Sequence, residues 1–147
     1  MKSIFSVLAI IVSTFVFSQK INWLSLDEAT KESKINPSKP ILLNLYTDWC
    51  GFCKKLDKET FVNPAVIEYV NQNYIPIKFN AEQKDMVTFL GVNYSFIGQA
   101  RANFLAYVLT QGRLSYPATI VLNNSGEAQK IIYGYRSPAD FNQDIKI

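Results

Sequence analysis

The most constraining feature of the chain is a run at residues 41–46, Ile-Leu-Leu-Asn-Leu-Tyr, in which nearly every side chain is apolar. A strand with one face in water alternates apolar and polar residues, whereas a strand covered on both faces reads as a continuous apolar run. The run therefore predicts a strand with helices on both sides of its sheet. Turn-forming residues at 36–40 mark its start.

The segments around this strand predict alternating helices and strands. Helices are expected from Leu26 with Ser25 as cap, over 50–60, from Pro64 after Asn63, over 101–109, and from Pro138 with Ser137 as cap. Further strands are expected at 21–23, 75–80, 118–122 and 129–133, the last two joined by a turn at 123–126. This order predicts an α/β fold with a mixed sheet between layers of helices.

The segment at residues 81–115 has the weakest pattern. A small hairpin is predicted about Gly91-Val92, between residues 87–90 and 93–97. The helix over 101–109 is expected to present one apolar face and to stop near Gly112. The residues expected on that face are Phe104, Leu105, Val108 and Leu109.

The N-terminus has the pattern of an export signal. Met1-Lys2 is followed by 14 uncharged residues, Ile4 to Phe17, and by the small residue Ser18. A membrane-spanning helix needs about 20 apolar residues, so the run fits a secretory signal peptide over 1–18 better than an uncleaved anchor, the alternative reading. A domain over 19–147 in an exported, most simply periplasmic, protein is then expected.

Composition removes several function classes. The chain has no histidine, which excludes His-based catalytic triads and His-containing zinc sites. Its formal net charge of +3 is too small and too evenly spread to suggest nucleic-acid binding. We therefore expect no metal, no nucleic acid and no bound cofactor.

The two cysteines, Cys50 and Cys53, are separated by two residues. A disulfide across so short a loop removes little entropy from the unfolded chain, so it is a poor structural staple. A metal site would need carboxylates to complete it. If Cys50 begins the helix over 50–60, the free N–H groups there, with Lys54 and Lys55 nearby, favour its thiolate. Cys53, one turn later, could then attack a mixed disulfide formed at Cys50.

The run Tyr46-Thr47-Asp48-Trp49-Cys50-Gly51-Phe52-Cys53-Lys54 resembles the active-site segment of the thioredoxin superfamily, and within it the exported bacterial thioredoxin-like domains. The resemblance implies a thioredoxin-like three-layer sandwich with an insertion before the strand that follows Pro117. It also implies a cis bond between Tyr116 and Pro117, with the Tyr116 backbone pairing with a substrate chain; an ordinary trans proline is the alternative. Trp49, Gly51 and Phe52 would complete the substrate-binding rim, although Trp49 could instead pack in the core.

Two residues depart from the family pattern. Asn44 stands where thioredoxins place a buried acid beneath the redox pair, and an amide cannot act as a carboxylate base. Phe52 replaces the usual proline between the cysteines. Both departures could change the redox poise of the pair. Asn44, for this reason, and Lys54, for its positive charge near Cys50, are the expected redox-tuning residues. The insertion at 81–115 is expected either to shape substrate choice or to be a tolerated surface elaboration.

Three functions fit the sequence. The favoured one is a monomeric reductase of disulfides in exported proteins, recharged by a membrane thiol–disulfide electron donor. The second is an oxidase or isomerase, since direction depends on the reduction potential of the pair. The third is a peptide-binding module in which the disulfide is only structural.

Overall fold

The computed structural model describes residues 20–147, so the predicted signal peptide over 1–18 lies outside the described residues. Among those residues, no helix has both the length and the apolar character needed to cross a membrane. The helices are α1 (Leu26–Ile35), α2 (Gly51–Lys55) with a π-helical continuation (Leu56–Thr60), α3 (Pro64–Asn73), α4 (Phe104–Leu109) and α5 (Pro138–Asp144). The strands are β1 (Ile41–Tyr46), β2 (Ile75–Asn80), β3 (Val87–Phe89), β4 (Val92–Tyr94), β5 (Phe96–Ile97), β6 (Ala102–Asn103), β7 (Ala118–Leu122) and β8 (Ala128–Tyr133).

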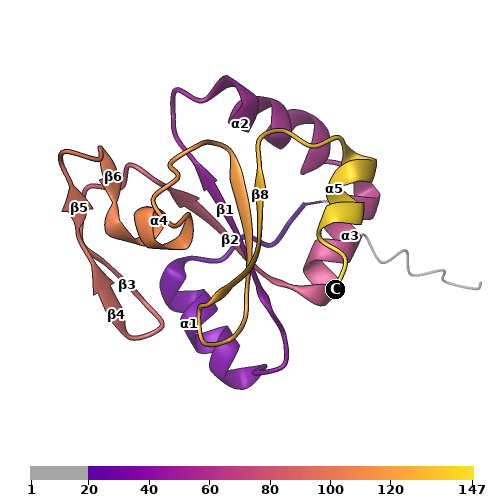
Figure 1. Ribbon diagram of the computed structural model, residues 1–147. Coiled ribbons are helices and arrows are strands. Elements are labelled where there is room, and N and C mark those ends of the chain that lie inside the picture. The colour runs from indigo at the N-terminus through magenta and orange to yellow at the C-terminus, as the bar shows by residue number, and fades with distance from the viewer. Residues whose placement is uncertain (1–19) are drawn as a thin grey trace, which may run out of the picture.

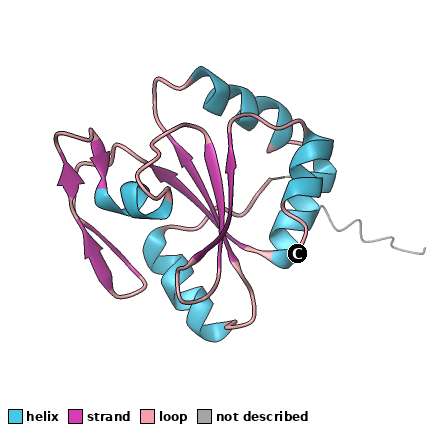
Figure 2. Ribbon diagram, in the orientation of Figure 1, coloured by secondary structure: helices cyan, strands magenta, loops and turns pink. Residues whose placement is uncertain are grey.

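The main sheet has four strands in the order β2-β1-β7-β8. β1 and β2 are parallel, and β7 is antiparallel to both β1 and β8, so the sheet is mixed. Helices cover both faces, with α1 on one side and α3 and α5 on the other (Figures 1 and 2). The α/β prediction is therefore confirmed.

β1 divides the hydrophobic core in two. Ile41, Leu43 and Leu45 enter the core that includes residues of α1 and α4, whereas Leu42 enters the core beneath α3 and α5. Because side chains alternate along a strand, Asn44 points to the same side as Leu42. This is also the side of Leu56, in the π-helical turn that continues the redox helix.

The two predicted helix caps, Ser25 and Ser137, are confirmed, and Asn63 proves to be a third. The Ser25 hydroxyl accepts the Glu28 backbone N–H at 3.2 Å, and the Glu28 carboxylate accepts the Ser25 N–H at 2.8 Å. These reciprocal bonds satisfy free N–H groups at the start of α1 and hold the pKa of Glu28 below its ordinary value. Asn63 and Ser137 cap α3 and α5, each followed by proline.

The insertion differs in detail from the prediction. It contains two small hairpins, β3–β4 and β5–β6, of which only the first was predicted. The helix predicted over 101–109 is α4, which begins at Phe104, where the Asn103 side chain caps it. Residues 101–103 are therefore not helical.

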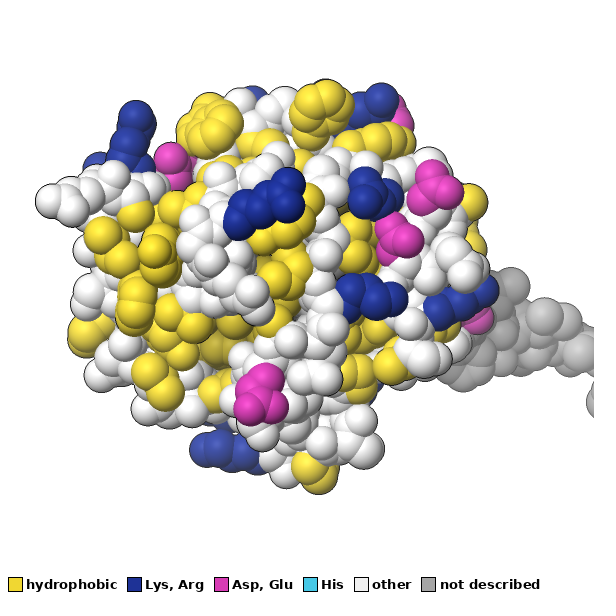
Figure 3. All heavy atoms as spheres, in the orientation of Figure 1, with side chains coloured by type: hydrophobic (Ala, Val, Ile, Leu, Met, Phe, Trp, Pro, Cys, Tyr) yellow, Lys and Arg dark blue, Asp and Glu magenta, His cyan; other side chains and the backbone are white. Residues whose placement is uncertain are grey.

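The predicted apolar face of α4 is wrong in part. Leu105, Ala106 and Leu109 are buried, but Phe104 and Val108 are exposed. With only six residues anchored by Asn103, the helix rotates so that Ala106 faces the core. Figure 3 shows hydrophobic side chains gathered on the side of the molecule formed by the insertion.

The predicted edge strand at residues 21–23 is also wrong. Only Leu24 makes a bridge, parallel to Ile77 of β2. Ile21 and the ring of Trp23 instead pack with the core on the α3–α5 side, where Trp23 meets Phe61 edge-on at 5.0 Å. Packing of these side chains and two hydrogen bonds between the Asn71 side chain and the backbone of Lys20 and Asn22, rather than strand pairing, hold residues 20–23.

Candidate functional site: a disulfide at a helix start beside a cis-proline loop

Cys50 and Cys53 form a disulfide, with Cα atoms 5.2 Å apart. Cys50 is the residue immediately before α2, in an extended conformation, and its Sγ accepts the backbone N–H of Cys53 at 3.1 Å. The predicted position of Cys50 at the helix start is confirmed. A sulfur held here receives a backbone donor that would stabilise it as a thiolate.

The two cysteines lie beneath an exposed aromatic rim. Each cysteine is only 4% exposed, while Trp49, just before Cys50, and Phe52, just before Cys53, are 65% and 62% exposed. Of the residues spaced three and four apart on this helix, Cys53, Leu56 and Thr60 are buried. Phe52 is exposed instead. Phe52 lies one residue before Cys53, about 100° around the helix, so it turns towards solvent when Cys53 turns inward.

The peptide bond between Tyr116 and Pro117 is cis, as the resemblance implies. The Pro117 carbonyl accepts the Gly134 N–H at 2.8 Å, which ties this loop to the end of β8. The Tyr116 ring meets the Trp49 ring edge-on, with centroids 6.1 Å apart, so the cis-proline loop is in contact with the redox segment. Among residues 20–147, neither the Tyr116 N–H nor its carbonyl has a hydrogen-bond partner, which leaves both open to an incoming chain.

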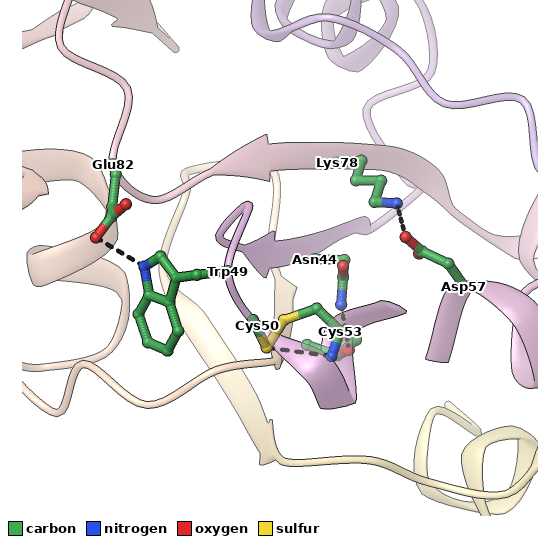
Figure 4. The surroundings of a disulfide bond; sticks show 8 residues. Asn44, Trp49, Cys50, Cys53, Asp57, Lys78 and Glu82 are labelled. Atoms are coloured by element: carbon green, nitrogen blue, oxygen red, sulfur yellow. Dashed lines mark hydrogen bonds and ion pairs between the residues drawn. A yellow bond between two sulfur atoms is a disulfide. The ribbon is translucent and has the colours of Figure 1, made fainter. Parts of the chain in front are cut away.

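Asn44 is buried, 1% exposed, and its side-chain amide donates to the Thr119 hydroxyl at 3.1 Å. The two residues face one another across β1 and β7. Figure 4 shows Asn44 alongside Cys53, on the sheet that supports the redox helix. Two neutral side chains joined by a hydrogen bond therefore stand at the position where the resemblance implies a buried acid. Thr119 was not predicted, although its position opposite Asn44 in the strand pairing could have identified it.

The two lysines after Cys53 have different surroundings. Lys54 is exposed, whereas the Lys55 ammonium lies 4.5 Å from the centre of the Tyr135 ring. The Tyr135 hydroxyl donates to Glu59 at 2.6 Å, a bond that raises the pKa of this tyrosine. Both side chains are exposed, but Lys55 also contacts the Tyr135 ring, whereas within residues 20–147 Lys54 makes no ion pair or cation–π contact.

Glu82 was missed at the sequence level. Its carboxylate accepts the indole N–H of Trp49 at 3.1 Å, and Figure 4 shows it reaching the ring from the segment after β2. Burial raises the pKa of the neighbouring Tyr116, and the charge of Glu82 adds to this. The signal was available, because β1 and β2 are parallel and residues that follow them meet at the same sheet edge.

An ion pair joins β2 to the π-helical turn that continues α2. Lys78 of β2 contacts Asp57 at 2.6 Å (Figure 4). Its ammonium also lies 5.1 Å from the centre of the Tyr46 ring. Within residues 20–147, no cluster of three or more Cys, Asp or Glu side chains could hold a metal ion.

A family model for the thioredoxin-like domain matches residues 26–146. The chain belongs to this family. The match extends from the start of α1 to the residues after α5, so it includes the Cys50–Cys53 disulfide and the cis-proline loop.

Relatives of known sequence agree with this assignment. A protein of Archaeoglobus fulgidus is 30% identical over 102 residues, which are 63% of this chain and 80% of that protein. The thiol:disulfide interchange protein DsbD of Citrobacter koseri is 48% identical over 42 residues, 29% of this chain. The aligned stretch spans only 7% of that DsbD, so the likeness concerns a small part of a much longer protein.

Solved structures share the fold. The DsbH oxidoreductase superimposes with a TM-score of 0.65 at 16% identity, covering 96% of this chain and 92% of that one. The oxidised C-terminal domain of Neisseria meningitidis DsbD gives a TM-score of 0.54 at 20% identity, covering 80% and 90%. The predicted thioredoxin-like sandwich is thus confirmed as the fold.

Proposed function

We propose that this protein is a thiol–disulfide oxidoreductase that reduces disulfides in exported proteins. The observation that carries the proposal is the Cys50 sulfur at the start of α2, accepting the Cys53 N–H, beside a cis-proline loop with an unpaired backbone. The first feature favours a nucleophilic thiolate, and the second offers an edge on which an extended peptide can form hydrogen bonds.

In the proposed reaction, the reduced protein begins with two thiols. The Cys50 thiolate attacks one sulfur of a substrate disulfide, forming a mixed disulfide and releasing the other substrate sulfur as a thiolate that takes up a proton. The Cys53 thiolate then attacks the Cys50 sulfur, which forms the Cys50–Cys53 disulfide and releases the second substrate thiol. Two electrons and two protons pass to the substrate.

The reducing direction draws support from the context of Gly51 and Lys54, which resembles that of thioredoxins. A reductase must be recharged after every cycle, so the proposal includes a thiol–disulfide electron donor in the membrane and a periplasmic location after export. The likeness to part of DsbD is compatible with such exchange. The proposed working form is a monomer.

Insulin reduction with dithiothreitol as electron source tests whether the dithiol is the active centre. Cys50→Ser and Cys53→Ser are both expected to lose nearly all activity, while Lys31→Gln, an exposed change on α1, should keep it. Full activity in both cysteine variants would contradict the dithiol mechanism and favour a binding module.

Trapping of mixed disulfides tests the assigned roles. A Cys53→Ala variant should accumulate stable mixed disulfides with substrate through Cys50, because no second thiol is present to release them. A Cys50→Ala variant should accumulate few. Efficient trapping through Cys53 instead would reverse the assignment of nucleophile and resolving thiol.

The reduction potential of the pair, measured in glutathione buffers, decides the direction. For a reductase we expect a reduction potential below that of the cytosolic glutathione pool, which is about −220 to −260 mV by biochemical extraction. A value well above that range would favour the oxidase or isomerase.

A further inference from the structure

Two adjoining hollows form a groove that begins at the redox site and runs into the insertion. The first, of about 420 Å³, is lined by Trp49 and Tyr116 and by residues of the insertion. The second, of about 310 Å³, includes Lys84 and Phe96. Glu82 and Arg101 line both hollows, so the two are continuous at these side chains. Trp49 precedes Cys50 directly, and Figure 4 shows its ring beside Cys50, so the near end of the groove lies close to the redox pair.

The far wall of the groove is held by a buried amide. Asn103, fully buried, donates from its side chain towards the carbonyls of Gln83, Asp85 and Tyr94, at 3.2 to 3.4 Å. Its backbone N–H also donates to the Ala81 carbonyl at 2.7 Å. These bonds tie the segment after β2 to the second hairpin, so Glu82 and Arg101 are held on a common framework.

Arg101 is presented without a protein partner. It occupies the turn between β5 and β6 in a left-handed conformation, φ 52°, and is exposed. Within residues 20–147 its guanidinium makes no hydrogen bond and no ion pair; the two ion pairs there are Lys78–Asp57 and Arg136–Asp144. Glu82 shares the groove but directs a carboxylate oxygen to the Trp49 indole.

The charge of the groove follows from these contacts. Its charged side chains are Arg101, Lys84 and Glu82, two positive and one negative. The carboxylate is already a hydrogen-bond acceptor for Trp49, whereas Arg101 has five N–H donors to offer. A planar guanidinium in this state matches a carboxylate best, because two parallel N–H bonds can reach its two oxygens.

We propose that this groove is a substrate subsite in which Arg101 binds an aspartate or glutamate side chain near the reacting cysteine of a polypeptide. The proposal rests on the proposed function and names the substrate class, disulfides with a carboxylate side chain close in sequence. It also assigns a role to the insertion, which supplies the cation that a bare redox loop would lack.

Peptides with one cysteine in mixed disulfide with 2-thiopyridine provide the test. Each reaction converts the protein dithiol to its disulfide and releases peptide thiol and thiopyridine, whose absorbance gives the rate. Thiopyridine is the better leaving group, so attack falls on the peptide sulfur and brings the peptide to the groove. The peptides carry Glu, Gln or Lys at each of the four positions before and after cysteine.

We expect the Glu peptide to react about two- to fivefold faster than its Gln counterpart at one or two positions, the range typical of an exposed ion pair. The preference should weaken as salt rises. Arg101→Gln should bring the Glu-to-Gln rate ratio close to one, and Arg101→Glu should favour the Lys peptide. Lys31→Gln, which removes an equal charge on α1, should keep the wild-type ratio.

The outcomes separate the two proposals. If wild type reduces every peptide but shows no Glu preference at any position, the subsite is wrong while the reductase stands. A preference that survives in Arg101→Gln also overturns the subsite. If the wild-type dithiol reduces none of the peptides, the proposed function itself fails.

Discussion

At the scale of single residues, Gly51 is a glycine that neither the backbone conformation nor the packing requires. A Cβ built on Gly51 would meet no atom within 4 Å, and its backbone is not in the left-handed region. Neither folding nor packing therefore requires glycine between Cys50 and Phe52. We propose that glycine at this position gives clearance to an incoming peptide.

Gly51→Ala tests this reading. Alanine at the first position of a helix should raise the free energy of unfolding by up to about 1 kcal/mol, since it restricts the unfolded chain. The rate for peptide disulfides should fall relative to that for a small disulfide such as hydroxyethyl disulfide. Urea unfolding and the two rates provide the measurements; an unchanged ratio would remove Gly51 from the substrate-binding surface.

The Asn44–Thr119 pair is a second feature at this scale. Thr119→Val leaves a buried amide without its partner and should cost about 1–3 kcal/mol of unfolding free energy. Asn44→Leu leaves the buried Thr119 hydroxyl without its hydrogen-bond partner in the same way. The double variant Asn44→Leu/Thr119→Val should lose less than the sum of the two single losses, because no unpaired group remains.

Urea unfolding of the four proteins gives the coupling free energy directly. Strictly additive losses would show that the hydrogen bond between the two side chains adds nothing. Reduction potentials of the same proteins then report whether Asn44 tunes the redox pair, as the resemblance implies. A potential unchanged by Asn44→Leu would leave Asn44 a packing residue.

At the scale of elements, the insertion is a unit fastened by one side chain. The Asn103 amide spans three carbonyls, and its Oδ1 accepts the Leu105 N–H at 3.0 Å to cap α4. The small hairpins have few buried side chains of their own, so these bonds hold them near the core.

Asn103→Ala is expected to lower the free energy of unfolding by about 2–4 kcal/mol, the sum of a lost helix cap and unpaired carbonyls. Asn93→Ala, which removes an exposed amide from β4, should change it by less than about 0.5 kcal/mol. Urea unfolding compares the two. Equal effects in both variants would mean that the insertion does not depend on the buried amide.

The elements also show how far the sequence predicts the structure. Capping residues and apolar runs are local signals, so α1, β1, α3, β7 and α5 follow from them nearly residue by residue. The β5–β6 hairpin and the rotation of α4 depend on Asn103, whose partners lie 9 to 20 residues away. The site divides in the same way, because Cys50 and Cys53 are visible in the motif, whereas Glu82 and Arg101 reach the groove only through the fold.

At the scale of the whole molecule, stability is linked to the redox state. The disulfide joins residues only three apart, so the chain-entropy model assigns it roughly 2 kcal/mol at most. Unfolding and disulfide reduction form a thermodynamic cycle. The difference in unfolding free energy between the oxidised and reduced proteins therefore equals the difference between the free energies of reducing the disulfide in the folded and in the unfolded chain. A stabilised reduced form would make the protein an oxidant.

The proposed reductase should therefore be more stable oxidised than reduced, by up to about 2 kcal/mol. Unfolding curves with and without excess reductant measure this. The Cys50→Ser/Cys53→Ser double variant is the control, since reductant should leave its curve unchanged. Greater stability of the reduced protein would contradict the proposed direction.

The burial of both cysteines, each 4% exposed, also bears on oxidative damage. When a peroxide oxidises a thiolate, it first gives a sulfenic acid, and a nearby thiol converts this to a disulfide before further oxidation. Cys53 lies one helical turn from Cys50, so a sulfenic acid at Cys50 would close to the same disulfide that the proposed cycle forms. Mild peroxide would then leave the protein in a state that the proposed electron donor could restore, without progress to irreversible sulfinic acid.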